Sequence, residues 1–180
     1  MKRKIFIAVN LPNQTKKKIS RAIEEWRDLP MRWTKEDHYH ITLNFIGYVH
    51  DEDLIDICEK MRQVAQKIEL FDINFTSIEL APTADNPRML WLCAPESEEF
   101  QKLGEKIAEA LGVPLKSQKK SSPHITLGRI KRIRWEKLPE KPAIKKEFLA
   151  CVPVETIDVM ASEFTKQGLE YFIIESCPIQ

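Results

Sequence analysis

The chain has 180 residues, which is long enough for one domain with a substantial core or for two closely packed lobes. Hydrophobic residues make up 43% and charged residues 31%, with 5 glycines and 11 prolines, so the composition excludes a disordered or collagen-like protein. The formal net charge is +1, from 28 Lys and Arg against 27 Asp and Glu. Taken alone, this total argues against a strongly basic nucleic-acid-binding protein.

The charge is unevenly distributed along the chain. Residues 1–35 carry 10 basic and 3 acidic side chains, and residues 116–146 carry 11 and 2. The other two segments are acidic: residues 36–115 carry 6 basic and 16 acidic side chains, and residues 147–180 carry 1 and 6. Two cationic segments can meet in space and attract a phosphate, or they can simply keep a surface solvated.

Nothing in the sequence indicates export or membrane insertion. The basic start is followed by an apolar run that Asn10 and Pro12 interrupt, which is too short for the core of a signal peptide. No apolar segment approaches the ~18 residues of a membrane span, so we expect a cytoplasmic protein without a membrane partner. The cysteines are widely spaced without a C-x-x-C pair, and we expect buried free thiols rather than zinc ligands or disulfides. They are Cys58, Cys93, Cys151 and Cys177.

Hydrophobic periodicity predicts three helices after an N-terminal strand. A β-branched apolar run at residues 5–9 predicts a buried strand. Apolar residues at helical spacing then predict an amphipathic helix over about residues 14–27. A second helix is predicted from 54 to 68, with acidic residues at its N-terminal end. The third begins after Ser97 as its N-cap and ends at Gly112.

The remaining elements are strand-like runs. They span residues 40–47, 71–80, 89–93, 124–130, 154–160 and 171–174. Because several follow one another without an intervening helix, we expect largely antiparallel sheets and the α+β class. The lysine-rich residues 131–150 are predicted to form an irregular or partly helical excursion. No linker divides the chain, so residues 1–180 are treated as a single domain.

One internal repeat is found. The tetrapeptide His-Ile-Thr-Leu at residues 40–43 recurs at residues 124–127, 84 positions later. Four identical residues are weak evidence by themselves, but both copies contain one of only four histidines and both open a β-branched run. Side chains at i and i+2 share one face of a strand. Each copy therefore presents one imidazole and one hydroxyl on the same face, with apolar side chains on the other.

This pattern favours acid–base chemistry on an anionic substrate. Two imidazoles at one cleft suit concerted proton transfer, because the ordinary pKa of histidine, about 6.5, lets one accept a proton while the other donates. The hydroxyls of Thr42 and Thr126 can donate hydrogen bonds to phosphate oxygens. No metal is needed for this chemistry. His38 could be taken for a metal partner of His40, but a His-x-His pair alone is an incomplete site. We assign no role to His38 or His50.

The motifs resemble those of the two-histidine phosphoesterase superfamily. Within it, the chain is most similar to the bacterial and archaeal RNA 2′,3′-cyclic phosphodiesterases, formerly described as 2′-5′ RNA ligases. The resemblance extends along essentially the whole chain. Its matching segments are residues 5–12, Arg32 with Trp33, residues 40–47, residues 87–92, residues 123–129 and residues 168–171.

The resemblance implies a fold and a reaction. The fold would have two pseudo-symmetric lobes, each a mainly antiparallel sheet with outer helices, and the active-site cleft between the sheets. The reaction would be hydrolysis of an RNA 2′,3′-cyclic phosphate end to a 2′-phosphomonoester without metal or cofactor, by a protein that we expect to be a monomer. His40 would be the general acid that protonates the departing 3′-oxygen, and His124 the general base for the attacking water. Thr42 and Thr126 would hold the non-bridging phosphate oxygens.

Two further residues are candidate substrate contacts. The resemblance implies that Arg129 contacts phosphate, although strict alternation from His124 puts it on the opposite face unless a bulge or bend at Gly128 re-aims it. By the same alternation from His40, Phe45 faces the core, and we expect it to pack there. The alternative for Phe45 is base stacking at the edge of the cleft.

Other functions are compatible with the same residues. The cationic segments also fit an RNA- or nucleotide-binding module whose histidines do not turn over substrate. The chemistry could instead act on a 2′-5′ linked oligonucleotide or on a small cyclic nucleotide. Microscopic reversibility would also allow 2′-5′ ligation as a secondary activity.

Overall fold

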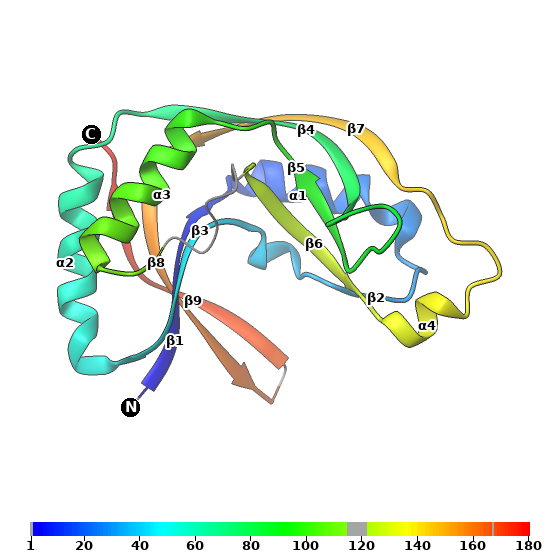
Figure 1. Ribbon diagram of the computed structural model, residues 1–180, viewed down its shortest axis with the longest axis horizontal. Helices are drawn as coiled ribbons and strands as arrows, with labels where there is room; N and C mark the ends of the chain where they lie inside the picture. Colours follow the sequence, from blue (N-terminus) through cyan, green and yellow to red (C-terminus); the bar gives the residue numbers. More distant parts are fainter. Residues whose placement is uncertain (1, 115–121, 167) are drawn as a thin grey trace.

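The computed structural model describes residues 2–114, 122–166 and 168–180, and it contains two antiparallel sheets (Figure 1). The first sheet has the strand order β3 (His40–His50), β1 (Lys2–Asn10), β8 (Thr156–Thr165) and β9 (Gly168–Pro178). The second has the order β2 (Met31–Trp33), β6 (His124–Ile130), β5 (Met89–Cys93), β4 (Phe71–Ala81) and β7 (Lys145–Val154). The predicted α+β class and antiparallel pairing are confirmed. The two copies of the repeat begin β3 and β6, so each sheet carries one.

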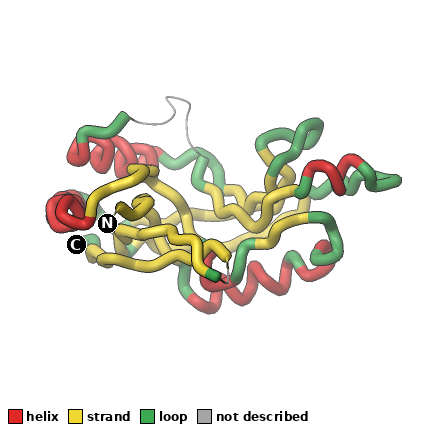
Figure 2. The backbone as a smooth tube through the Cα atoms, turned by 90° about the horizontal axis from the view of Figure 1, so that it is seen from below, coloured by secondary structure: helices red, strands yellow, loops and turns green. Residues whose placement is uncertain are grey.

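Helices lie on the outside of the two sheets. They are α1 (Asn13–Ala22), α2 (Leu54–Ala65), α3 (Glu98–Leu111) and α4 (Arg132–Glu136), with short 3-10 helices η1 (Glu24–Trp26), η2 (Glu36–His38) and η3 (Asp51–Asp53). The helices α2 and α3 cover the outer face of the first sheet, and α1 lies behind the second (Figures 1 and 2). Within the described ranges no helix is long and apolar enough to cross a membrane.

The helix boundaries follow local sequence signals. The Ser97 hydroxyl accepts a hydrogen bond from the Phe100 amide at 3.2 Å, and Gly112 ends α3 at a φ of 63°, as the capping signals predicted. The predicted helix over residues 14–27 is shorter than expected. It ends at Ala22, and the chain continues as the 3-10 helix η1 after Ile23.

The prediction for residues 131–150 was wrong from Lys145 onward. This stretch begins with α4, but it then forms β7, which pairs along β4. Strand β7 is at the edge of its sheet, and most of its side chains are partly or fully exposed. An edge strand can carry lysines and a proline, here Pro153, and the exposed positions of β7 include the apolar Leu149, so apolar and polar residues do not alternate clearly in the sequence. The three-residue strand β2 was also not predicted.

The core lies between the helices and the outer faces of the sheets. Ile41 and Ile125 are fully buried in it, as their alternation with the motif residues predicted. All four cysteines are free, and Cys58 and Cys177 are buried. Cys151 is exposed on β7, so the expectation of buried thiols was wrong there. Part of the second cationic segment, residues 116–121, lies outside the described residues.

Candidate active site

A cavity of about 250 Å³ lies where strands of the two sheets face each other. Its walls come from β3, β1, β8 and β9 of the first sheet and from β6 of the second, together with residues of the connection from β2 to β3. All six candidate site residues line it: His40, Thr42, Phe45, His124, Thr126 and Arg129. The structure thus brings together two motifs that are 84 positions apart in the sequence.

The His40 imidazole is held by hydrogen bonds on both ring nitrogens. Its Nδ1 is 2.7 Å from the backbone carbonyl oxygen of His38, which can only accept, so Nδ1 carries the proton and donates. Its Nε2 lies 3.1 Å from the Thr42 hydroxyl. The ring packs between Phe6 and Tyr171, with centroid separations of 5.0 Å and 5.2 Å. In the neutral tautomer, Nε2 is therefore the basic nitrogen, and it is close to the threonine hydroxyl of the same motif.

The His124 imidazole is held in an analogous way. Its Nδ1 is 3.2 Å from the backbone carbonyl oxygen of Ser122, again two residues before the histidine. The ring stacks on the Trp91 indole with a centroid separation of 3.9 Å and an interplanar angle of 20°. Both motifs thus use Nδ1 to bond a backbone carbonyl two positions earlier. This leaves Nε2 of each ring as the nitrogen available for proton transfer.

Burial makes both imidazoles weak bases. Desolvation lowers the pKa of His40 from 6.5 to about 4, and the positive charge of Lys16 acts in the same direction. The hydrogen bond to the His38 carbonyl only partly opposes this shift. Desolvation also lowers the pKa of His124. Both shifts favour the neutral form of the ring.

A β-bulge follows the threonine in each motif. In β3, Thr42 pairs with Ala8 and Asn44 pairs with Ile7, so Leu43 is the additional residue. In β6, Leu127 occupies the same position of the repeat, between Thr126 and Gly128. A bulge inserts one residue without a partner and reverses the alternation of side chains beyond it. The fifth residue after each histidine consequently returns to the face that carries the histidine.

The bulges decide where Phe45 and Arg129 lie. Phe45 is 51% exposed and lines the cavity, so the prediction that it packs in the core was wrong. Simple alternation failed because it did not include the bulge at Leu43. Arg129 also lines the cavity. The bulge next to Gly128 turns its side chain to the face that carries His124, so strict alternation no longer argues against the phosphate contact that the resemblance implies.

Gly128 packs closely against β2 at the second bulge. A Cβ added there would lie 3.2 Å from the Trp33 ring, a tight contact, and 3.5 Å from the Arg32 carbonyl oxygen, an ordinary one. A side chain at this position would therefore need the Trp33 ring to shift by a few tenths of an ångström.

Several cavity residues carried no role in the sequence analysis. Tyr171 lies against both His40 and His38, and its segment had matched only as part of the family resemblance. Trp91 does not line the cavity itself; it also lies in a matched segment, but no pattern indicated that it stacks on His124. The other lining residues are Lys4, Phe6, Thr34, His38, Tyr48, Ser162, Phe164 and Leu169.

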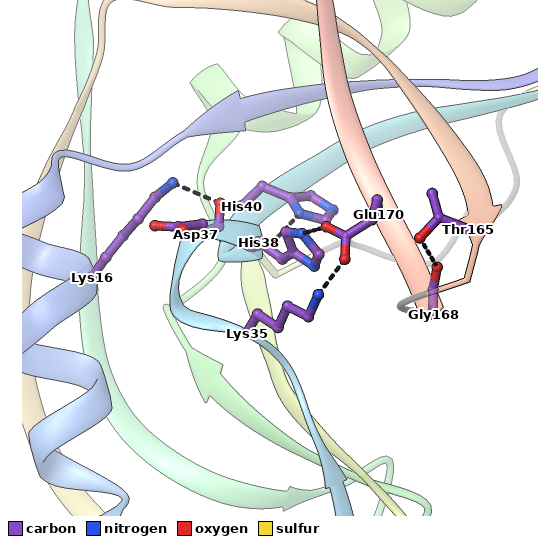
Figure 3. Close-up of polar contacts among 8 residues, drawn as sticks. All are labelled: Lys16, Lys35, Asp37, His38, His40, Thr165, Gly168 and Glu170. Carbon is purple, nitrogen blue, oxygen red and sulfur yellow. Dashed lines mark hydrogen bonds and ion pairs between the residues drawn. The ribbon is translucent and has the colours of Figure 1, made fainter.

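Two contacts hold the 3-10 helix η2, which supplies the carbonyl that His40 bonds (Figure 3). Glu170 reaches from β9 to bond His38 Nε2 at 3.0 Å, and it forms an ion pair with Lys35. On the other side, Lys16 Nζ from α1 donates to the Asp37 carbonyl oxygen at 3.0 Å. The bond with Lys35 holds the pKa of Glu170 below its usual value, so Glu170 stays ionised. The connection between the two sheets is thus tied to β9 and to α1.

Metal ligation has no support from the arrangement of side chains. In residues 2–114, 122–166 and 168–180, no group of three or more His, Cys, Asp or Glu side chains is arranged to hold a metal ion. His38, which shares the cavity with His40, bonds Glu170 instead.

Comparisons with known proteins agree on one family. A model described as LigT like Phosphoesterase matches residues 9–91. A protein of Aeropyrum pernix named RNA 2′,3′-cyclic phosphodiesterase is 30% identical over 151 residues, which cover 79% of this chain and 83% of the relative. A protein of the same name from Thermotoga maritima is 27% identical over 183 residues, covering 97% and 95%.

Solved structures share the fold over nearly the whole chain. A Thermus thermophilus protein superposes with a TM-score of 0.78 at 25% identity, covering 98% of this chain and 97% of that one. Escherichia coli LigT, solved in complex with ATP, gives a TM-score of 0.77 at 18% identity, covering 100% and 99%. The sequence is similar to that of the archaeal relative, and the fold is shared with these structures. Both findings agree with the family that the paired motifs indicate. The chain belongs to the LigT-like phosphoesterase family, within the two-histidine superfamily that its repeated His-x-Thr pattern resembles.

Proposed function

We propose that this protein hydrolyses RNA 2′,3′-cyclic phosphate ends to 2′-phosphomonoesters, using His40 and His124 for proton transfer and no metal. The main observation behind the proposal is that both imidazoles line one cavity and are held there by the same kind of hydrogen bond. Each donates Nδ1–H to a backbone carbonyl two residues earlier, and each keeps Nε2 for chemistry. Several relatives that cover most of the chain bear the name of this activity.

The proposed reaction is an in-line displacement at phosphorus. His124 Nε2 takes a proton from water, and the water oxygen forms a new bond to phosphorus. The bond from phosphorus to the 3′-oxygen breaks, and protonated His40 Nε2 gives its proton to that oxygen. The products are a 2′-phosphate and a free 3′-hydroxyl, with one proton gained by His124 and one lost by His40. The assignment of acid and base follows the family resemblance.

Substrate binding supplies the protonation state that this reaction needs. Burial favours the neutral form of both unliganded imidazoles, which suits the base but not the acid. A cyclic phosphodiester carries one negative charge, and a negative charge beside His40 favours its protonated form. Binding of the anion is therefore expected to raise the pKa of His40 and to load the general acid with its proton.

Hydrogen-bond donors would stabilise the negative charge that develops on the phosphate. The hydroxyls of Thr42 and Thr126 are on the same strand faces as the two histidines and would donate to the non-bridging oxygens. Arg129 adds a positive charge to this wall of the cavity. The exposed ring of Phe45 would stack on the base of the terminal nucleotide.

The test is incubation with a short RNA that ends in a 2′,3′-cyclic phosphate. We expect a 2′-monoester as product, a bell-shaped dependence of rate on pH, and unchanged turnover in EDTA. The His40→Ala and His124→Ala variants should each lose about 10²-fold or more in turnover, because each removes a proton-transfer group. His50→Ala is the matched control, since His50 is exposed at the far end of β3 and does not line the cavity.

The outcomes separate the proposal from its alternatives. Near-normal turnover in both alanine variants would refute the role of the histidines. Loss of activity in EDTA that zinc restores would indicate a metallohydrolase instead. Salt-sensitive RNA binding without product would indicate a catalytically silent module. If a 5′-hydroxyl replaces water as the nucleophile, the same steps give a 2′-5′ phosphodiester, and a ligation assay would detect it.

A further inference from the structure

Two arginines face each other across the pair of strands next to the cavity. Arg32 in β2 is the direct partner of Arg129 in β6, and both side chains are exposed. Directly opposed residues in an antiparallel pair share a face, and their Cβ atoms are about 4.5–5.5 Å apart. Like charges in this position repel each other and destabilise the sheet. The arrangement therefore costs stability unless an anion binds between or beside the two guanidinium groups.

The face that the two arginines share is the face of the cavity. Arg129 itself lines the cavity, and so does Thr34, two positions after Arg32. Thr34 continues the pairing of β2, because its amide donates to the Leu127 carbonyl oxygen at 2.9 Å. Met31 has the opposite orientation and is buried in the core. Arg32 thus extends the cavity wall outward, next to Arg129 but outside the cavity lining.

The ion pairs of the described residues do not include this pair of arginines. Among the residues that the structure describes, neither Arg32 nor Arg129 forms an ion pair with Asp or Glu. Three of the other arginines form such pairs: Arg3 with Asp51, Arg27 with Glu24 and Arg62 with Glu175. What distinguishes Arg32 and Arg129 is that they are directly paired beside the cavity. Both guanidinium groups are exposed and are therefore available to an external anion.

We propose that Arg32 forms a second phosphate subsite, which binds the phosphodiester that precedes the cyclic phosphate in an RNA chain. This inference rests on the proposed function, because the cyclic phosphate must occupy the cavity beside Arg129. A terminal nucleotide within an RNA chain carries a phosphodiester on its 5′-oxygen in addition to its cyclic phosphate. A cyclic mononucleotide has only the cyclic phosphate. The substrate class is therefore an RNA chain rather than a free cyclic nucleotide.

The test compares two substrates in two variants. The substrates are a 2′,3′-cyclic mononucleotide and a dinucleotide that ends in the same cyclic nucleotide. For Arg32→Gln we expect about a tenfold loss of kcat/KM on the dinucleotide and less than about a twofold change on the mononucleotide, because only the dinucleotide has the second phosphate. Arg21→Gln is the matched control, since Arg21 is exposed on α1 and does not line the cavity; it should change neither value.

Folding and binding measurements make the test independent of turnover. Because Arg32→Gln removes a like-charge repulsion, its thermal midpoint should stay equal to that of the wild type or rise. Binding of a dinucleotide with a terminal 2′-phosphate should become less salt-dependent, with the slope of log K against log[salt] smaller by about one. The slope for a 2′-mononucleotide should not change.

Two results would overturn the subsite. One is an equal loss on both substrates in Arg32→Gln, and the other is an unchanged salt slope for the dinucleotide. A wild-type protein that turns over neither substrate would refute the proposed function. In that case the salt slopes would still decide whether Arg32 binds the second phosphate.

Discussion

Lys16 offers a test of how the structure positions the His40 imidazole. Its side chain is only 8% exposed, and its Nζ donates to the Asp37 carbonyl oxygen at 3.0 Å. The next carbonyl along the chain, that of His38, accepts the hydrogen bond from His40 Nδ1. Replacing Lys16 with methionine keeps an unbranched side chain of similar length and removes the ammonium group. We expect this change to loosen η2 and, through it, the orientation of His40.

The expected effect on stability is small because two contributions oppose each other. A hydrogen bond from a charged donor contributes about 1.5–3 kcal/mol, and this is lost. Burial disfavours the charged form of Lys16 and lowers its pKa, so part of the loss is recovered when the charge is removed. The unfolding free energy of Lys16→Met should therefore fall by about 1 kcal/mol, which urea denaturation can measure.

The expected effect on activity is larger and has a distinct signature. A catalytic ring that is misplaced by a fraction of an ångström can lose about tenfold in turnover, and we expect that loss in kcat. The positive charge of Lys16 also helps to lower the pKa of His40. Without that charge the pKa of His40 rises, so the limb of the pH–rate profile that belongs to His40 should move to higher pH. A short RNA with a cyclic phosphate end, assayed from pH 4 to pH 9, gives both values.

Lys18→Met is the control for these measurements, because Lys18 is exposed on the same helix. It should leave kcat and the pH profile unchanged. If Lys16→Met lowers stability but changes neither kcat nor the His40 limb, Lys16 acts only on folding. That result would refute the positioning role.

Two further predictions concern stability. The pKa of His40 is about 4 in the folded protein, against 6.5 for a histidine side chain in water, so the unfolded chain binds more protons between these pH values. Acidification through this window should lower the unfolding free energy by up to about 3 kcal/mol; a His40→Gln variant that keeps the same pH slope in urea denaturation would contradict this. Asp158, 1% exposed, accepts hydrogen bonds from Asn10 at 2.9 Å and from Ser176, so Asp158→Ala should cost about 3 kcal/mol. Asp85→Ala, at an exposed position, should cost almost nothing, and equal losses in the two variants would exclude the buried network as the cause.

Sequence patterns predicted those parts of the fold that depend on local periodicity. The third helix was predicted because its apolar stripe, its Ser97 cap and its Gly112 terminus are all local signals. Strand β7 was missed because its exposed positions include the apolar Leu149 and Cys151, so apolar and polar residues do not alternate clearly in the sequence. Tertiary context also decides where a helix ends, as with α1, which stops at Ala22 although the apolar spacing continues to Trp26.

The same distinction applies to the site. His40 and Thr42 share a face because they are two residues apart, and no longer-range information was needed to predict it. Phe45 lies beyond a bulge, and a bulge depends on how β3 pairs with β1. The bond between Glu170 and His38 joins residues 132 positions apart, so no local pattern could indicate it.

The bulges explain why the internal repeat has four residues. In each copy the first residue presents an imidazole, the second anchors the strand in the core, and the third presents a hydroxyl. The fourth, Leu43 or Leu127, is the additional residue of the bulge. Since the bulge reverses the alternation, the fifth residue after each histidine also lines the cavity, and these residues are Phe45 and Arg129.

Phe45 and Arg129 thus occupy equivalent positions in two otherwise similar motifs. One places an aromatic ring on the wall formed by the first sheet, and the other places a guanidinium on the wall formed by the second. An aromatic ring favours stacking with a base, whereas a guanidinium favours phosphate. In the proposed reaction the repeated part of each motif would supply the matched proton-transfer groups, and the fifth residue after each histidine would distinguish the two walls. This difference would give a nucleotide one preferred orientation in the cavity, which an enzyme must impose if only the 3′-oxygen is to leave.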